Sequence, residues 1–199
     1  MDSIFLSELL VTRLSHDIIG NIGAVANAVE LLNEGDDDDK EDINNILNYS
    51  SSVLSKRLKF FRLCFGLSNA SVKDTNELYE ICSNYLSTIG NPNYPISVEL
   101  NILTHKIHKF VMPAIMMMAD VLVKGGKIAV NQMEDHLSIG VTSSHLLNAS
   151  KLANISKIIE GKEVDENISS YAPLYYLITY VKDANANIRL SGNELIIEG

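Results

Sequence analysis

Residues 3–33 read SIFLSELLVTRLSHDIIGNIGAVANAVELLN, and this stretch contains no proline. Its aliphatic side chains recur at steps of three and four residues, which places them on one face of a helix. These side chains are Leu10, Leu14, Ile18, Ile22, Val25, Val29 and Leu32. The sequence therefore predicts that the chain begins with one long amphipathic helix.

A second long helix is predicted after an acidic break. Gly35 is followed by four aspartates, 36–39, which is typical of a solvated loop that leads into a helix N-terminus. The apolar stripe then resumes at Ile43, Leu47, Leu54, Leu58, Phe61 and Phe65, and Gly66 with Ser68 marks its end. Two such helices form an antiparallel hairpin, which alone buries too little apolar surface to be stable. Either two copies pair into a four-helix bundle, which is the simpler solution, or the second half of the chain covers both stripes.

The remainder of the chain has the pattern of a compact two-layer α/β unit, in which strands and helices are interspersed. Helices are expected over 74–88, 106–123, 150–160 and 173–184, and strands over 96–102, 127–132, 136–142, 187–190 and 194–198. The predicted fold class is therefore α+β. A helical hairpin is expected over residues 1–68 and a two-layer α/β domain over residues 69–199.

Charge and hydropathy exclude several classes of partner. The formal net charge of −9 would repel a phosphate backbone over most of the surface, so nucleic acid is not expected to bind. No apolar run reaches the roughly 18–20 residues of a membrane span. The closest run, 110–123, is interrupted by Pro113 and Asp120. The acidic N-terminus does not resemble a secretory signal. We therefore expect a cytoplasmic protein with no membrane partner.

The two cysteines and the one close pair of histidines do not indicate a metal site. Cys64 and Cys82 lack metal-ligand spacing, so two free, buried thiols are expected in a reducing compartment. His105 and His108 lie near each other, but the sequence offers no third ligand for zinc beside them.

His16 lies nearly opposite the centre of the first apolar stripe, because a helix turns about 100° per residue. Its neighbours on that face are Phe5, Leu9, Thr12, Gly20, Gly23 and Asn27. An ordinary solvated face would carry Lys, Glu and Gln, whereas each glycine costs about 1 kcal/mol of helix propensity relative to alanine. Small residues beside an exposed imidazole let another protein's backbone come close, and Phe5, Leu9 and Ile19 could supply apolar contact.

Imidazole is suited to carrying a phosphoryl group, because one ring nitrogen is a nucleophile while the other keeps a proton near neutral pH. The resulting phosphoramidate transfers readily to a carboxylate. Asp17 follows His16 directly and could hydrogen-bond the ring or accept its proton. His16 is thus the candidate nucleophile and Asp17 its partner. The residue types alone leave open that His16 is an ordinary surface histidine.

Residues 13–24, RLSHDIIGNIGA, and 27–32, NAVELL, resemble the signature of the ChpT-type histidine phosphotransferases of alphaproteobacteria. That signature is a basic residue, a leucine, a small residue or cysteine, His-Asp, a Gly-Ala-Ile-like stretch and Glu-Leu-Leu. FRLCFG at 61–66 resembles the ending of the family's second helix. The resemblance covers the hairpin well and the rest of the chain only in the order of its elements.

The resemblance implies a homodimer built on a histidine-kinase-like hairpin, followed by a degenerate ATP-binding-like domain. In that family the histidine takes a phosphoryl group from the receiver domain of a hybrid kinase and passes it to response regulators. His16 matches the phosphorylated histidine, and Asp17 matches the acid that follows it. The surface expected to dock receiver domains is formed by Leu9, Arg13, Ile19, Gly20 and Gly23, of which Arg13 matches the family's basic residue.

ATP binding is not expected in the second domain. Kinases of this kind hold magnesium with an asparagine on a buried helix, whereas 112–120, MPAIMMMAD, contains none and is most simply core packing. The segment 143–148, SSHLLN, lacks the glycines of an Asp-x-Gly-x-Gly loop. Magnesium would belong to the receiver's acidic site, so no cofactor of this chain is expected. The alternatives are a degenerate ATP-dependent histidine kinase and a non-catalytic dimeric adaptor.

One departure from the family concerns the helix just after the histidine. Gly20 and Asn21 stand where family members and related kinases often have a polar residue followed by proline. Proline bends a helix, so its absence predicts that the bend is missing here.

Overall fold

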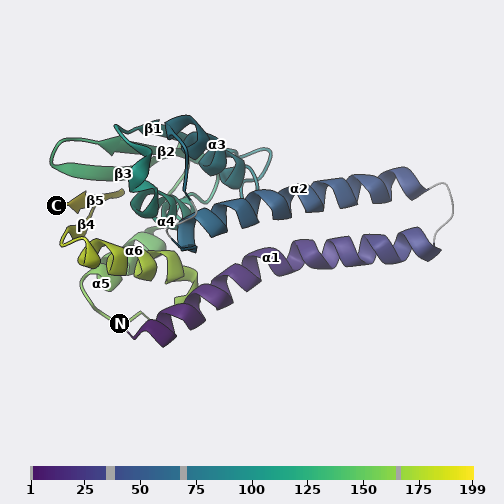
Figure 1. Cartoon of the computed structure of the whole chain (residues 1–199), viewed down its shortest axis with the longest axis horizontal. Coiled ribbons are helices and arrows are strands. Elements are labelled where there is room, and N and C mark those ends of the chain that lie inside the picture. The colour runs from purple at the N-terminus through teal and green to yellow at the C-terminus, as the bar shows by residue number, and fades with distance from the viewer. Residues whose placement is uncertain (1, 35–38, 68–70, 165–166) are drawn as a thin grey trace.

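The structure is a computed structural model and describes residues 2–34, 39–67, 71–164 and 167–199. A long helical hairpin projects from a two-layer α/β part (Figure 1). The hairpin consists of α1 (Ser3–Glu34) and α2 (Lys40–Phe65), which run antiparallel and side by side. Both predicted helices are therefore confirmed, and the fold class is α+β.

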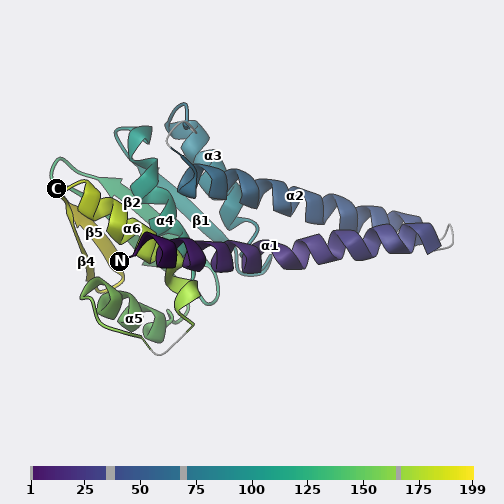
Figure 2. The ribbon, with the colours of Figure 1, turned by 60° about the horizontal axis from the view of Figure 1, so that its bottom comes forward.

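The α/β part contains a five-stranded mixed sheet in the order β1-β2-β3-β5-β4, in which only β1 and β2 are parallel. Its strands are β1 (Ile96–Asn101), β2 (Gly126–Gln132), β3 (His136–Thr142), β4 (Asn187–Ser191) and β5 (Glu194–Glu198). Its helices are α3 (Thr75–Leu86), α4 (His108–Ala119), α5 (Ala149–Ile159) and α6 (Ala172–Asp183), with short 3-10 turns η2 (His105–Ile107) and η3 (Ile168–Tyr171). Helix α6 and the 3-10 turn η3 contact the N-terminal part of α1, and Figure 2 shows α6 beside it.

Some predicted features lie outside the described residues. They are Gly35, the aspartates 36–38, Ser68 and the boundary between residues 68 and 69, which stays a prediction. Asp39, the last aspartate of the run, precedes α2 without a side-chain cap hydrogen bond. Within the described ranges, no helix combines the length and the apolarity that crossing a membrane requires.

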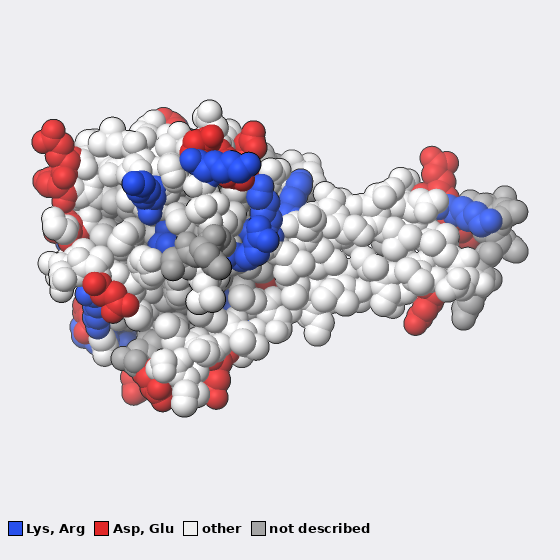
Figure 3. Space-filling model, viewed as in Figure 1, with Lys and Arg blue, Asp and Glu red and all other residues white. Residues whose placement is uncertain are grey.

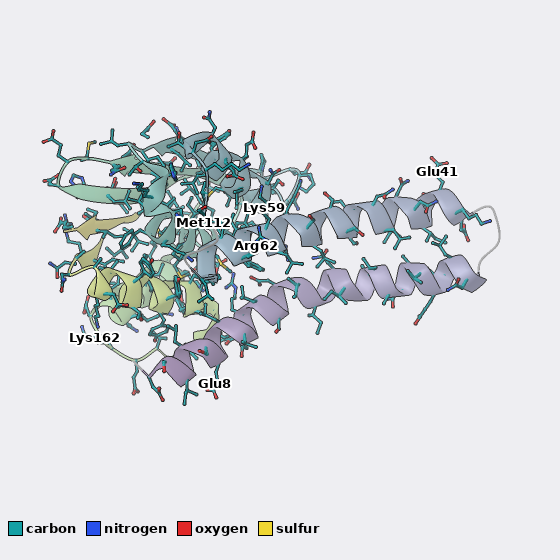
Figure 4. All side chains as sticks on the ribbon, in the orientation of Figure 1. Glu8, Glu41, Lys59, Arg62, Met112 and Lys162 are labelled. Carbon is teal, nitrogen blue, oxygen red and sulfur yellow. The ribbon has the colours of Figure 1, made fainter. Side chains whose placement is uncertain are left out.

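The apolar core continues from the sheet into the base of the hairpin. The methionine run of α4, 116–118, is fully buried, as predicted, and Met112 lies in the same crowded interior (Figure 4). Phe60 of α2 stacks on Tyr85 of α3, with ring centroids 3.9 Å apart. Aromatic pairs of this kind stabilise a core beyond their buried area. The hairpin is therefore anchored to the α/β part by shared packing.

A buried lysine joins α4 to the end of α2. The Nζ of Lys109 donates hydrogen bonds to the carbonyls of Cys64, at 3.2 Å, and Gly66, at 2.6 Å. The last carbonyls of a helix have no partner within the helix and carry its negative dipole end, which a cation stabilises. Burial lowers the pKa of Lys109. This contact helps to set the direction in which the hairpin leaves the α/β part.

Only the base of the hairpin is covered by the rest of the chain. Leu14 and Ile18 pack against the core, whereas Ile22, Val29 and Leu58 remain 50%, 46% and 51% exposed. Residues 18–29 and 43–55 contain no Asp, Glu, Lys or Arg, and Figure 3 shows an almost uncharged arm surface between its base and its tip. The second half of the chain therefore covers the two stripes only in part.

α1 is bent where it leaves the α/β part (Figure 1), although the family's proline is absent. Nη1 of Arg57, on α2, donates a hydrogen bond to the backbone carbonyl of Asp17, and Gly20 follows within one turn. A side-chain donor that competes for a helix carbonyl, together with a nearby glycine, favours a bend at that point. The prediction that the bend would be missing was therefore wrong.

Cys64 and Cys82 are free and fully buried, as predicted. Burial raises the pKa of both thiols, and the thiolate is the form that reacts. We expect neither thiol of the native protein to react with a water-soluble aromatic disulfide at mildly alkaline pH, and both to react in concentrated guanidinium chloride. Rapid labelling of the native protein would contradict this packing.

Candidate functional site

His16 projects from the part of α1 that leaves the α/β core, and its side chain is 85% exposed. Its Nδ1 lies 3.4 Å from Oδ1 of Asp17. In the tautomer that carries its proton on Nδ1, the ring donates to this carboxylate and the lone pair of Nε2 stays available to solvent. The predicted exposure of His16 and the predicted proximity of Asp17 are both confirmed.

Asp17 is held from its other side by Arg13, one turn earlier on α1. Nε of Arg13 donates to Oδ2 of Asp17 at 2.9 Å, and the two side chains are only 14% and 15% exposed. The other end of the guanidinium forms a bidentate pair with Asp120, at 2.9 and 3.2 Å, and donates to the Ser170 carbonyl at 3.1 Å. Burial alone would lower the pKa of Arg13, but the carboxylates of Asp120 and Asp17 raise it, so the guanidinium stays charged.

Asp120 ends α4 and lies between two cations. Besides Arg13, the Nζ of Lys151 approaches its Oδ2 to 3.8 Å. Lys151 also donates to Oγ of Ser170 at 2.9 Å and lies 3.8 Å from the centre of the buried Tyr171 ring. A cation over an aromatic face is stabilised by it. Asp120 is thus part of a fixed network formed by α4, α5 and η3.

Arg57 of α2 forms a second link between the α/β part and α1, also at Asp17. Arg57 donates from Nε to Oγ1 of Thr88, at 3.1 Å, and from Nη2 to the Thr88 carbonyl, at 2.7 Å. Its Nη1 donates to the backbone carbonyl of Asp17. Arg57 therefore ties α1 to the segment after α3 without contacting the carboxylate of Asp17.

The five residues predicted to dock a partner are not all available on the surface. Ile19, Gly20 and Gly23 are exposed. A Cβ added at either glycine would meet no atom of the described residues within 4 Å, apart from the adjoining backbone of α1 itself. Leu9 is only 5% exposed, so its predicted exposure was wrong, and Arg13 is turned inward. The reason is that η3 and α6 cover a second face of the N-terminal part of α1, which a helical wheel cannot foresee.

The sequence interpretation missed the role of Asp120, Arg57 and Lys151. One signal was present, because Asp120 interrupts the otherwise apolar end of a buried helix and such a carboxylate requires a partner. Its partner is 107 residues away in the sequence, and spacing alone does not reveal it.

Metal ligands are not grouped in the described part of the chain, where no three His, Cys, Asp or Glu side chains come together as a metal site requires. His108 instead directs Nδ1 toward the carbonyl of His105, at 3.2 Å.

Comparisons with known proteins agree with the resemblance to phosphotransferases. Over 132 residues, or 65% of this chain, the sequence is 30% identical to protein phosphotransferase ChpT of Brucella abortus (strain 2308), and the match spans 62% of that protein. The fold is similar to that of a bacterial phosphotransferase solved at 1.7 Å, with a TM-score of 0.73, 22% identity, and 99% of this chain and 96% of the other covered. No protein-family model matches the chain. The chain is thus similar to ChpT-type phosphotransferases in sequence and has the fold of a bacterial phosphotransferase.

Proposed function

We propose that the protein is a histidine phosphotransferase, which relays phosphoryl groups between receiver-domain aspartates through a phosphohistidine at His16. The observation that carries this proposal is an exposed imidazole whose Nδ1 faces a carboxylate, while the carboxylate is itself held by an arginine. The similarity to protein phosphotransferase ChpT supports the same assignment.

The transfer follows from the geometry of His16 and Asp17. The lone pair of Nε2 attacks the phosphorus of a receiver's aspartyl phosphate, and the bond from phosphorus to the carboxylate oxygen breaks, so that the aspartate leaves as an anion. Nδ1 keeps its proton, and Asp17 stabilises the positive charge that develops on the ring. In the second half of the relay, a recipient carboxylate attacks phosphorus and the neutral imidazole leaves.

The receiver would dock on the face of α1 that carries Ile19, Gly20 and Gly23. Each glycine costs about 1 kcal/mol of helix propensity relative to alanine. Among the described residues, no atom beyond the neighbouring turns of α1 crowds either position. Close approach of another protein's backbone accounts for both glycines. The magnesium ion of the reaction belongs to the receiver's acidic site, and the relay is cytoplasmic.

The protein acts as a homodimer in this proposal. Ile22 and Val29 are one heptad apart and therefore share a face of α1, and Leu58 is exposed on α2. An exposed apolar stripe on a two-helix arm is best buried against a second copy of itself, which produces a four-helix bundle. Ile22 lies six residues after His16, which places the two about 120° apart around the helix. The histidine therefore stays accessible in the dimer.

Transfer without nucleotide tests the proposal. A receiver domain from the same organism, labelled on its aspartyl phosphate, is mixed with this protein in the absence of ATP. We expect the label to move to this chain in an acid-labile, alkali-stable linkage, as a phosphoramidate shows, and a receiver without its aspartate to deliver none. Labelling from ATP, with none from any receiver, would instead identify a kinase.

A further inference from the structure

An unbroken series of polar contacts leads from the end of α4 to the candidate nucleophile. Asp120 binds the guanidinium of Arg13 through two hydrogen bonds, Arg13 binds Oδ2 of Asp17, and Oδ1 of Asp17 faces Nδ1 of His16. The α/β part lies beside the N-terminal part of α1, which α6 and η3 contact (Figure 2). The α/β part is therefore connected to His16 indirectly, through Arg13 and Asp17.

We propose that Arg13 and Asp120 are positioning residues, through which the α/β part sets the orientation of the Asp17 carboxylate and thereby the tautomer of His16. The consequence for phosphoryl transfer rests on the proposed function, whereas the consequence for the tautomer does not.

The shape of the guanidinium makes this assignment specific to arginine. Its donors form a rigid, planar fork, so binding Asp120 with the two terminal nitrogens fixes where Nε points. Nε points at Oδ2 of Asp17, at 2.9 Å. With Oδ2 engaged, the remaining oxygen, Oδ1, is directed at the ring of His16. A lysine at position 13 has one charged centre and cannot hold both carboxylates in this way.

The low exposure of the pair explains why the orientation persists. Arg13 and Asp17 are 14% and 15% exposed, so water competes poorly for their hydrogen bonds. The Ser170 carbonyl accepts a further hydrogen bond from Nη1 of Arg13, at 3.1 Å, which holds the fork against η3. A surface ion pair would exchange partners freely, but this one is held on three sides.

The tautomer matters because it selects the nucleophilic nitrogen. A neutral imidazole in water favours the proton on Nε2, which would leave Nδ1, next to the helix backbone, as the nucleophile. A fixed carboxylate at Nδ1 favours the other tautomer and leaves the lone pair of Nε2 directed to solvent. Loss of either positioning residue should therefore return the ring toward its solution preference.

The nitrogen-15 chemical shifts of the His16 ring report the tautomer directly. In the wild type we expect the Nδ1–H form to dominate when the ring is neutral, and Asp120→Asn and Arg13→Lys to shift the population toward the Nε2–H form. We also expect both variants to accept the phosphoryl group about tenfold more slowly, because small losses of orientation cost this much or more.

Arg57→Gln is the matched control, because Arg57 also ties α1 to the α/β part but contacts only the backbone of Asp17. It should keep the wild-type tautomer. An equal shift in Arg57→Gln, or no shift in Asp120→Asn and Arg13→Lys, overturns the proposal. If either Asp120→Asn or Arg13→Lys does not fold, the His16 tautomer in the other variant tests the proposal. A wild type with the Nδ1–H tautomer that accepts no phosphoryl group from any receiver would refute the proposed function and leave the positioning role standing.

Discussion

Replacement of His16 by glutamine is expected to abolish phosphoryl acceptance while the fold and the oligomeric state are retained. The amide nitrogen of glutamine is not a nucleophile, so the loss should exceed about 1,000-fold. The side chain is 85% exposed and its contact within the chain is to Asp17, so we expect the free energy of unfolding to change by no more than about 0.5 kcal/mol. Label transfer from a phosphorylated receiver measures the first effect, and chemical denaturation measures the second.

The chain contains a matched control in a second histidine that faces a neighbouring aspartate. Nδ1 of His136 lies 2.7 Å from Oδ1 of Asp135, at the start of β3. His136→Gln removes the same kind of contact from a site without an arginine fork or a glycine-containing docking face, and it should transfer like the wild type. Normal transfer by His16→Gln, or its loss in His136→Gln, would show that the carrier has been assigned to the wrong residue.

Replacement of Val29 by arginine is expected to convert the proposed homodimer into a monomer. Val29 is 46% exposed in the single chain and lies one heptad from Ile22 on the stripe assigned to the bundle interface. A symmetric dimer would bury the new charge twice without a partner, which should weaken association by at least about 100-fold. Sedimentation velocity over a range of protein concentrations measures this change.

Leu31→Arg is the control for this experiment. Leu31 is two residues from Val29 and similarly exposed, at 51%, but lies about 200° further around the helix, away from the stripe. It should leave the dimer intact. Dissociation in both variants would place the interface elsewhere on the arm, and dimers in both would exclude this stripe as the interface.

The hairpin and the exposure of His16 were predictable because they depend on local periodicity. The apolar stripe from Leu10 to Leu32 predicts a helix whatever packs against it. His16 lies opposite that stripe and is exposed, as predicted. The alternating strands and the buried methionine run followed from the same kind of pattern. The core of the fold and the exposure of His16 therefore follow from the sequence, whereas the role of His16 as the phosphoryl carrier is a proposal.

Tertiary structure decided which side chains support that histidine. A helical wheel describes one helix and assumes one buried face, whereas the α/β part covers a second face of α1 near its N-terminus. Leu9 and Arg13 therefore turn out to be internal. Arg13 forms a hydrogen-bonded ion pair with Asp120, which is 107 residues away in the sequence. Packing of α4 against the hairpin brings the two side chains together. A contact at that separation has no local period, so only the folded arrangement of the helices creates it.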